Sequence, residues 1–275
     1  MAEGSGLRYK DKVTIVTGGS KGIGLGVVTV FVKNGSKVVF CVKDVEESEG
    51  KAVEKELNGL GIGEATFIAC DVTKESEIKN LIDKTVEKYG RIDCLVNNAG
   101  SHPPHMPIDD FSSDDFRELL NLNLVSYFIA CKYALPHLRK VEGNIINISS
   151  LVGSIGQYGA VTYVATKGGV TSFSKALAID EAKYNVRVNS VSPGNVWTPL
   201  WNSGASKTTN PEQTIANGAD SQLMGRFGTI EEIGQVCLFL AAEGTYCTGI
   251  DLLSSGGAEL NFGIKTMKGE KDLPF

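Results

Sequence analysis

The sequence has no pair of cysteines spaced Cys-x-x-Cys, although it contains six cysteines among its 275 residues. Several of the six fall inside apolar runs, and this pattern favours reduced, buried thiols over a disulfide framework or a zinc site. We therefore expect no bound metal and a reducing compartment.

Long hydrophobic runs are also missing. No uninterrupted apolar run approaches the ~18 residues of a membrane span, and the first residues, MAEGSGLRYKDK, contain no apolar signal segment. Basic runs interleaved with aromatic residues are missing too, and 27 Lys and Arg against 32 Asp and Glu give a net charge of −5. We expect a cytoplasmic protein that binds neither membranes nor nucleic acid.

The residues that are present are typical of a soluble globular protein, with 42% hydrophobic and 21% charged residues. Short β-rich runs alternate with segments of helical periodicity. Strands are expected at 12–17, 37–42, 65–70, 92–97, 144–149, 186–192 and 250–253. Helices are expected from 23 to a stop at 34–35, around 53–60 and 78–86, and at 114–139, 161–182 and 230–242. This strict alternation predicts an α/β fold, a doubly wound parallel sheet with helices on both faces.

No shift in composition and no internal repeat divides the chain, so we predict a single domain over 1–275. The least regular stretch, 198–222, is rich in Asn, Ser, Thr and Gly and contains Pro211. Long loops in compact domains are usually functional, and we predict that this one is a substrate lid. A C-terminal tail is expected from about residue 258.

A glycine-rich segment, Thr17-Gly18-Gly19-Ser20-Lys21-Gly22-Ile23-Gly24, joins the first expected strand to the first expected helix. Glycines at such a junction let the backbone approach a pyrophosphate, and the start of the helix supplies free N–H groups. The spacing differs from the common G-x-G-x-x-G pattern. An ordinary glycine-rich turn is the alternative.

Tyr163 and Lys167 are four residues apart on one face of an expected helix, so the phenol and the ammonium are neighbours. A lysine on an apolar face is costly unless it is paired or has a function. The alternative is a lysine that extends to solvent beside a half-buried tyrosine. Ser150 follows the expected strand 144–149, and Asn123 lies on the inward face of the long helix. Taken alone, these two are an ordinary loop hydroxyl and an ordinary core amide.

Together, these motifs resemble the short-chain dehydrogenases/reductases over nearly the whole chain. The resemblance rests on 17–24, Asp71-Val72, Asn97-Asn98-Ala99-Gly100, Asn123, Ser150, Tyr163-x-x-x-Lys167 and Pro193-Gly194. It implies a single-domain Rossmann-type fold with about seven strands, a homotetrameric assembly, and an oxidoreductase with a nicotinamide cofactor.

The resemblance also implies roles for four catalytic residues. Tyr163 would take the proton of a secondary alcohol, and a phenol with a pKa near ~10 needs help to do so at neutral pH. Lys167 would lower that pKa and hold the nicotinamide ribose. Ser150 would bind the substrate oxygen, and Asn123 would hold a water that carries the proton to solvent.

For the cofactor, the resemblance implies a set of twelve further positions. They are Gly18, Ser20, Lys21, Ile23, Gly24, Lys43, Asp44, Asp71, Val72, Asn98, Val196 and Thr198. Val42 stands where NAD-preferring members have an acid that binds the ribose 2′-hydroxyl, while Lys21 and Lys43 are suited to a 2′-phosphate. We expect NAD, with Asp44 turned inward, and NADP is the alternative.

The substrate expectation follows from stretches similar to family members that oxidise 17-beta-hydroxysteroids or L-fucose, namely 101–104, 147–153, 163–168 and 193–201. His102, Gln157, Trp197 and Trp201 are the expected substrate contacts, with Leu200 and Met224 as apolar walls. His102 as a plain surface residue is the alternative. Two other functions stay open: a reductase of other small carbonyl compounds, and a nucleotide-binding member without catalysis.

Overall fold

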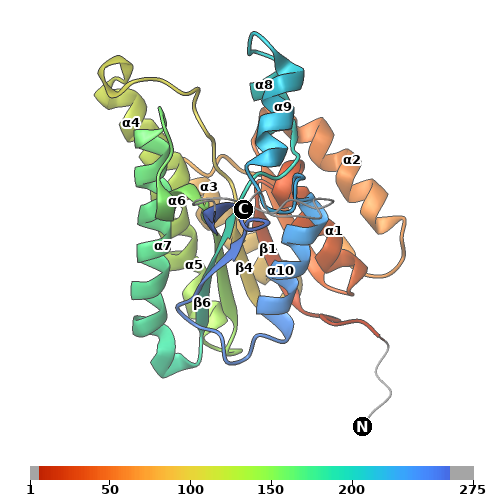
Figure 1. Cartoon of the computed structure of the whole chain (residues 1–275). Helices are drawn as coiled ribbons and strands as arrows, with labels where there is room; N and C mark the ends of the chain where they lie inside the picture. Colours follow the sequence, from red (N-terminus) through yellow and green to blue (C-terminus); the bar gives the residue numbers. More distant parts are fainter. Residues whose placement is uncertain (1–5, 261–275) are drawn as a thin grey trace.

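The computed structural model of the chain describes residues 6–260. Its centre is a seven-stranded sheet in the order β3-β2-β1-β4-β5-β6-β7, in which every neighbouring pair is parallel (Figure 1). The strands are β1 Val13–Thr17, β2 Lys37–Val42, β3 Glu64–Ala69, β4 Cys94–Asn97, β5 Asn144–Ile148, β6 Arg187–Pro193 and β7 Asp251–Ser254. The predicted doubly wound sheet is confirmed. The strand order reverses between β1 and β4, and such switch points are where open α/β sheets bind ligands.

Helices cover both faces of the sheet. One layer contains α1 Gly22–Lys33, α2 Glu47–Asn58 and α10 Ile230–Ala242, and the other contains α3 Glu75–Tyr89, α4 Ser113–Leu120, α5 Ser126–Leu138 and α7 Val161–Glu181 (Figure 1). Each layer has its own apolar core, one around Phe31 and Phe40 and the other around Ile15 and Leu81. The central strands β1, β4 and β5 are buried along their whole length, because both of their faces are covered.

The single helix predicted at 114–139 is interrupted. A π-helical turn, Asn121–Val125, separates α4 from α5. Its Asn123 is fully buried, whereas Val125 is exposed. Such turns insert one extra residue into a helix and are frequent at functional sites.

The prediction of an irregular loop at 198–222 was wrong in part, because most of this segment is helical. Helix α8 covers Pro199–Ala205 and helix α9 covers Pro211–Asp220. Thr198 caps the first and Asn210 the second, each accepting a backbone N–H with its side chain, and a proline occupies the first turn of each helix. The substrate lid at 198–222 stays a prediction.

The C-terminal tail predicted from about residue 258 begins with a 3₁₀ turn, Ala258–Leu260, and its remainder lies outside the described residues. All six cysteines are free, and five of them are buried, as expected from their apolar neighbours. Within residues 6–260, no helix has the length and apolarity to cross a membrane. The same residues contain no group of three or more His, Cys, Asp and Glu side chains arranged to hold a metal ion.

Candidate active site

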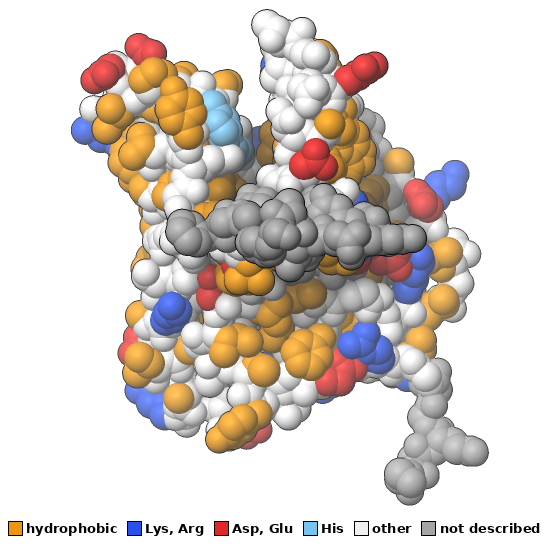
Figure 2. Space-filling model, viewed as in Figure 1, with side chains coloured by type: hydrophobic (Ala, Val, Ile, Leu, Met, Phe, Trp, Pro, Cys, Tyr) orange, Lys and Arg blue, Asp and Glu red, His pale blue; other side chains and the backbone are white. Residues whose placement is uncertain are grey.

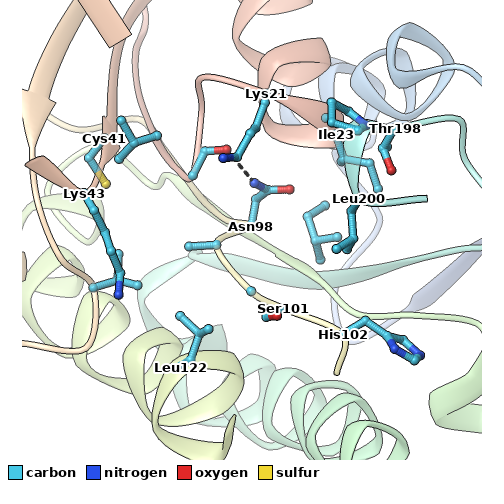
Figure 3. A pocket seen from close by; sticks show the side chains of 18 of the residues that line it. Lys21, Ile23, Cys41, Lys43, Asn98, Ser101, His102, Leu122, Thr198 and Leu200 are labelled. Atoms are coloured by element: carbon cyan, nitrogen blue, oxygen red, sulfur yellow. Dashed lines mark hydrogen bonds between the residues drawn. The ribbon is translucent and has the colours of Figure 1, made fainter. Parts of the chain in front are cut away.

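A cleft of about 520 Å³ lies at the carboxyl ends of the strands, beside the switch point between β1 and β4. The space-filling view shows the molecule hollowed between the part that carries α8 and α9 and the part that carries α4 (Figure 2). Lys21, Cys41 and Lys43 lie toward one end of the cleft, and Thr198, Leu200 and His102 lie toward the other (Figure 3). Tyr163 and Lys167 line the cleft as well.

The glycine-rich turn between β1 and α1 forms one wall of the cleft. Gly18 has φ +68°, and a Cβ on Gly24 would lie 2.0 Å from the carbonyl oxygen of Gly18, so both positions require glycine. Asn98 fixes the turn because its Nδ2 donates to the carbonyl oxygens of Thr17 at 2.9 Å and Gly18 at 3.0 Å. The turn therefore brings the backbone close to any ligand at the start of α1.

The residues of this turn fit the pyrophosphate of a dinucleotide. Ser20 is 6% exposed, and among the described residues its hydroxyl has no hydrogen-bond partner. Lys21 is the N-cap of α1, and its side chain makes no capping bond, so the first N–H groups of the helix are left to a ligand. A buried hydroxyl without a partner is costly, and a phosphate oxygen would satisfy it.

Tyr163 and Lys167 project from α7 toward the carboxyl end of β5. Lys167 is 4% exposed, and its Nζ donates to the carbonyl oxygen of Ile148 at 2.8 Å. The same Nζ lies 5.9 Å from the centre of the Tyr163 ring. Lys167 therefore does not extend to solvent, and the sequence alternative of a surface lysine is wrong.

The acidities of this pair are set mainly by burial. Burial raises the pKa of Tyr163 to about 12, although a hydrogen bond with Ser150 acts to lower it. Burial also lowers the pKa of Lys167 to about 7. The pKa of Tyr163 is therefore raised, whereas the sequence predicted that Lys167 would lower it. Burial disfavours the charged form of both groups.

Asn123 uses its side chain to hold the chain around Ser101. Its Oδ1 accepts from the N–H of Ser101 at 2.9 Å, and its Nδ2 donates to the carbonyl oxygen of Ser101 at 2.9 Å and to Thr166 Oγ1 at 3.1 Å. The π-helical turn is what directs this buried amide toward the segment before His102. The predicted water-holding role of Asn123 stays a prediction, and its Oδ1, which accepts one hydrogen bond here, keeps a second lone pair for it.

His102 joins the expected substrate residues to Tyr163. The two rings lie with their centres 4.1 Å apart. The Nε2 atom of His102 is 3.1 Å from Oε1 of Gln157, and its Nδ1 is 2.6 Å from the carbonyl oxygen of Pro103. His105 stacks on His102 as well, with ring centres 5.2 Å apart. His102 thus lines the cleft, and its contact with the substrate stays a prediction.

These features can be compared with known proteins. The family model described as short chain dehydrogenase matches residues 12–209.

The chain belongs to the short chain dehydrogenase family. Among curated relatives, an L-fucose dehydrogenase from Bos taurus is 53% identical over 260 residues, covering 94% of this chain and 94% of that protein. An L-fucose dehydrogenase from Rattus norvegicus is 54% identical over 258 residues, covering 94% and 93%.

Solved structures agree with this assignment. The aldohexose dehydrogenase of Thermoplasma acidophilum has a TM-score of 0.84 and 32% identity, covering 95% of this chain and 99% of that one. The L-sorbose reductase of Gluconobacter frateurii, solved with NADPH and L-sorbose, has a TM-score of 0.86 and 26% identity, covering 92% and 98%. This short chain dehydrogenase is therefore an oxidoreductase that uses a nicotinamide cofactor and acts on an alcohol.

The structure brings most of the expected cofactor residues to the cleft, though not all. Gly18, Lys21, Ile23, Lys43, Val72, Asn98 and Thr198 line it. Asp71 does not line it, because its carboxylate accepts from Thr73 and pairs with Lys43 at 3.5 Å. Gly24 and Val196 are buried beside the cleft. The side chain of Asp44 lies outside what the structure describes.

The two tryptophans expected at the substrate end, Trp197 and Trp201, have different surroundings. Trp201 packs on Phe227 with ring centres 4.6 Å apart, and its Nε1 donates to Asn195 at 3.3 Å. A Cβ on Gly218 would lie 2.4 Å from Trp201. Trp201 therefore anchors α8 against α9 rather than lining the cleft, which Leu200 does. Trp197 is 42% exposed beside this cluster.

Several residues that line the cleft were not predicted, notably Cys41, Glu46 and Leu122. Cys41 and Leu122 carry no polar signal that separates them from core residues. Glu46 is one of several acids in 44–49, and only its position two residues beyond Asp44 could have pointed to it.

Proposed function

We propose that this chain oxidises the anomeric CH–OH group of L-fucose, or of a closely similar free sugar, to the corresponding lactone with NAD. The observation that carries the proposal is His102, which lines the cleft, contacts the Tyr163 ring and is hydrogen-bonded to the exposed Gln157 at the rim. A sugar in a cleft needs partners for its hydroxyls, because an unpaired buried polar group costs about 1 to 3 kcal/mol. The relatives named L-fucose dehydrogenase support the same choice of substrate.

In the proposed mechanism, the side chains move one proton. The bound nicotinamide supplies the hydride acceptor for the substrate carbon. Tyr163 takes the proton of the substrate hydroxyl, and Ser150 hydrogen-bonds the same oxygen and helps to lower the pKa of Tyr163. The ammonium of Lys167, whose Nζ lies 5.9 Å from the centre of the Tyr163 ring, would favour the phenolate. Asn123 fixes Ser101 and so positions His102 over Tyr163.

The proposed cofactor site runs along the length of the cleft. Gly18, Ser20 and Ile23 would hold the pyrophosphate, Val72 the adenine, and Asn98 and Lys167 the ribose of the nicotinamide. Val196 and Thr198 would hold the carboxamide.

We propose NAD rather than NADP as the cofactor. The two lysines suited to a 2′-phosphate each have a carboxylate partner, Glu46 for Lys21 and Asp71 for Lys43. These carboxylates offset the positive charge that would attract the phosphate.

A 17-beta-hydroxysteroid is the second candidate substrate. Leu200 lines the cleft and is 55% exposed, and Trp197 and Met224 are 42% and 55% exposed. A steroid would cover such apolar side chains, and burial of apolar surface contributes ~25 cal/mol per Å². These exposed side chains on and near α8 also support the proposal that 198–222 acts as a lid.

We further propose a homotetramer in the cytoplasm. Phe128 is 52% exposed and Val125 41% exposed on adjoining turns of the α4–α5 region, and β7 is an edge strand of the sheet. Exposed apolar surface and unpaired strand edges are typical of contacts between subunits. The six free cysteines support a reducing compartment. Light scattering of the purified protein measures the assembly, and the mass of a monomer would contradict the tetramer.

Substrate assignment is tested by following nicotinamide absorbance with L-fucose, its stereoisomers, 17-beta-hydroxysteroids and simple carbonyl compounds, using both cofactors and both reaction directions. We expect the highest kcat/KM for oxidation of L-fucose with NAD. Faster reduction of unrelated carbonyl compounds would favour a carbonyl reductase. Tight nucleotide binding without turnover of any substrate would favour a non-catalytic member of the family.

A further inference from the structure

The end of the cleft near β2 lacks an acid at the position where the strand ends. Val42 is the last residue of β2, lines the cleft, and has no side chain atom that accepts a hydrogen bond. In dinucleotide-binding folds, an acid in this region accepts a hydrogen bond from the 2′-hydroxyl of the adenosine ribose. A chain that discriminates NAD from NADP therefore needs another group at this end of the cleft.

Glu46 lies at this end of the cleft. It closes the 3₁₀ turn Asp44–Glu46 that follows β2, and it lines the cleft together with Val42. Its side chain is 31% exposed, so it is partly withdrawn from solvent. The turn therefore returns a carboxylate to the region that Val42 leaves apolar.

Glu46 is held in place by Lys21. Lys21 Nζ donates to Glu46 Oε1 in a close ion pair that joins the turn before α1 to the turn after β2. A carboxylate accepts hydrogen bonds on both oxygens, so engagement of Oε1 leaves Oε2 as an acceptor for a ribose hydroxyl. Lys21 thus orients the acid without using all of its acceptor capacity.

The second lysine at this end is also occupied. Lys43 pairs with Asp71 at 3.5 Å, and the Asp71 carboxylate in addition accepts from the N–H and hydroxyl of Thr73. A 2′-phosphate placed beside Glu46 would meet a like charge, and its natural cationic partner, Lys21, is already bound to that acid.

We propose that Glu46 determines the cofactor specificity of this chain: its carboxylate accepts the 2′-hydroxyl of the adenosine ribose of NAD, and its pairing with Lys21 keeps a 2′-phosphate out. The inference rests on the proposed function in one respect, the use of NAD. It does not depend on which alcohol is oxidised.

The test measures the binding of NAD and NADP to the full-length protein by calorimetry, with no substrate present. Glu46→Gln keeps the shape of the side chain but removes the charge that neutralises Lys21. We expect weaker binding of NAD, tighter binding of NADP, and a ratio of the two dissociation constants that shifts toward NADP by about 10-fold or more, as the loss of a charge-assisted hydrogen bond implies.

Two further variants make the result specific to Glu46. Glu47→Gln removes the same charge one residue away, from a side chain that pairs with Lys51 at 2.5 Å and does not line the cleft, and we expect an unchanged ratio. Adding Lys21→Met to Glu46→Gln should abolish the gain in NADP binding, because Lys21 is the cation whose charge Glu46→Gln no longer neutralises. Thermal unfolding of each variant checks that it is folded.

An unchanged ratio in folded Glu46→Gln, or an equal shift in Glu47→Gln, would overturn the inference. A wild type that binds NADP more tightly than NAD would overturn it as well. Failure of the proposed substrate has a different signature, because the wild type would then bind NAD selectively and not oxidise L-fucose.

Discussion

The imidazole ring of His102 lies against the phenol ring of Tyr163, with ring centres 4.1 Å apart and ring planes inclined by 43°. Nε2 of the same imidazole contacts Gln157, 55 residues away in sequence. The phenol proposed to transfer the proton and the polar pair proposed to bind sugar hydroxyls therefore form one connected group. This connection makes the choice of substrate and the chemistry testable with the same variants.

The first prediction concerns this pair. His102→Ala and Gln157→Ala together should lower kcat/KM for L-fucose more than for a 17-beta-hydroxysteroid, because the steroid relies on apolar burial and the sugar on paired hydroxyls. The two single variants should each produce most of the loss, since each leaves the other side chain without its partner. Steady-state kinetics on both substrates measures this, and equal losses on the two would contradict the assignment.

A second prediction concerns the buried ammonium of Lys167. Its pKa is lowered from 10.5 to about 7 by burial, so between these values the unfolded chain holds a proton that the folded chain has released. The contribution of Lys167 to the free energy of unfolding therefore rises as the pH increases from about 7 toward 10.5. Below about pH 7 both states hold the proton, and the free-energy cost of burying the charge is fully present.

Lys167→Met removes that cost. The variant should gain the most stability relative to wild type below about pH 7, and its advantage should shrink as the pH rises toward 10.5. Urea unfolding of both proteins across this range measures the difference, and a difference independent of pH would contradict the lowered pKa. The variant should also lose activity and nucleotide affinity, because Lys167 is assigned to both.

A third prediction concerns the glycine-rich turn. Gly24→Ala would place a Cβ 2.0 Å from the carbonyl oxygen of Gly18, which forces the turn away from the geometry that holds the pyrophosphate. Nucleotide binding measured by calorimetry should be lost or strongly weakened. Gly204→Ala is the matched control, because a Cβ there has no heavy atom within 4 Å, and it should leave nucleotide binding unchanged.

Much of the fold was predictable because hydrophobic periodicity is a local signal. The strand at 37–42 and the helix at 230–242 were predicted with the bounds that the structure shows. Helices α8 and α9 were not predicted because their residues are mainly polar and small. The only local signals of a helix start are the capping pairs Thr198-Pro199 and Asn210-Pro211. The π-helical turn has no periodicity of its own, so a continuous helix was the natural prediction.

The candidate site was predictable where a residue type carries its chemistry in a motif, as Tyr163 and Lys167 do. Contacts between side chains that are distant in the sequence could not be predicted. Lys21 and Glu46 are 25 residues apart, and nothing in either segment indicates that they pair. The hydrogen bonds of Asn123 with Ser101 and Thr166 depend on packing that only the folded chain reveals. The same holds for the pKa of Tyr163, in which burial outweighs the hydrogen bond with Ser150.

Tyr163 is proposed to move the proton in the oxidation of a sugar bound in this cleft. The most direct measurement is the rate of nicotinamide reduction by wild type and Tyr163→Phe with L-fucose at saturating NAD, with nucleotide affinity determined for both proteins. We expect wild type to turn over L-fucose and Tyr163→Phe to lose ~10²- to 10⁴-fold in kcat while still binding NAD, because only the transferring oxygen is removed. A near-normal kcat in the variant would contradict the account, and so would a wild type that binds NAD but does not oxidise L-fucose.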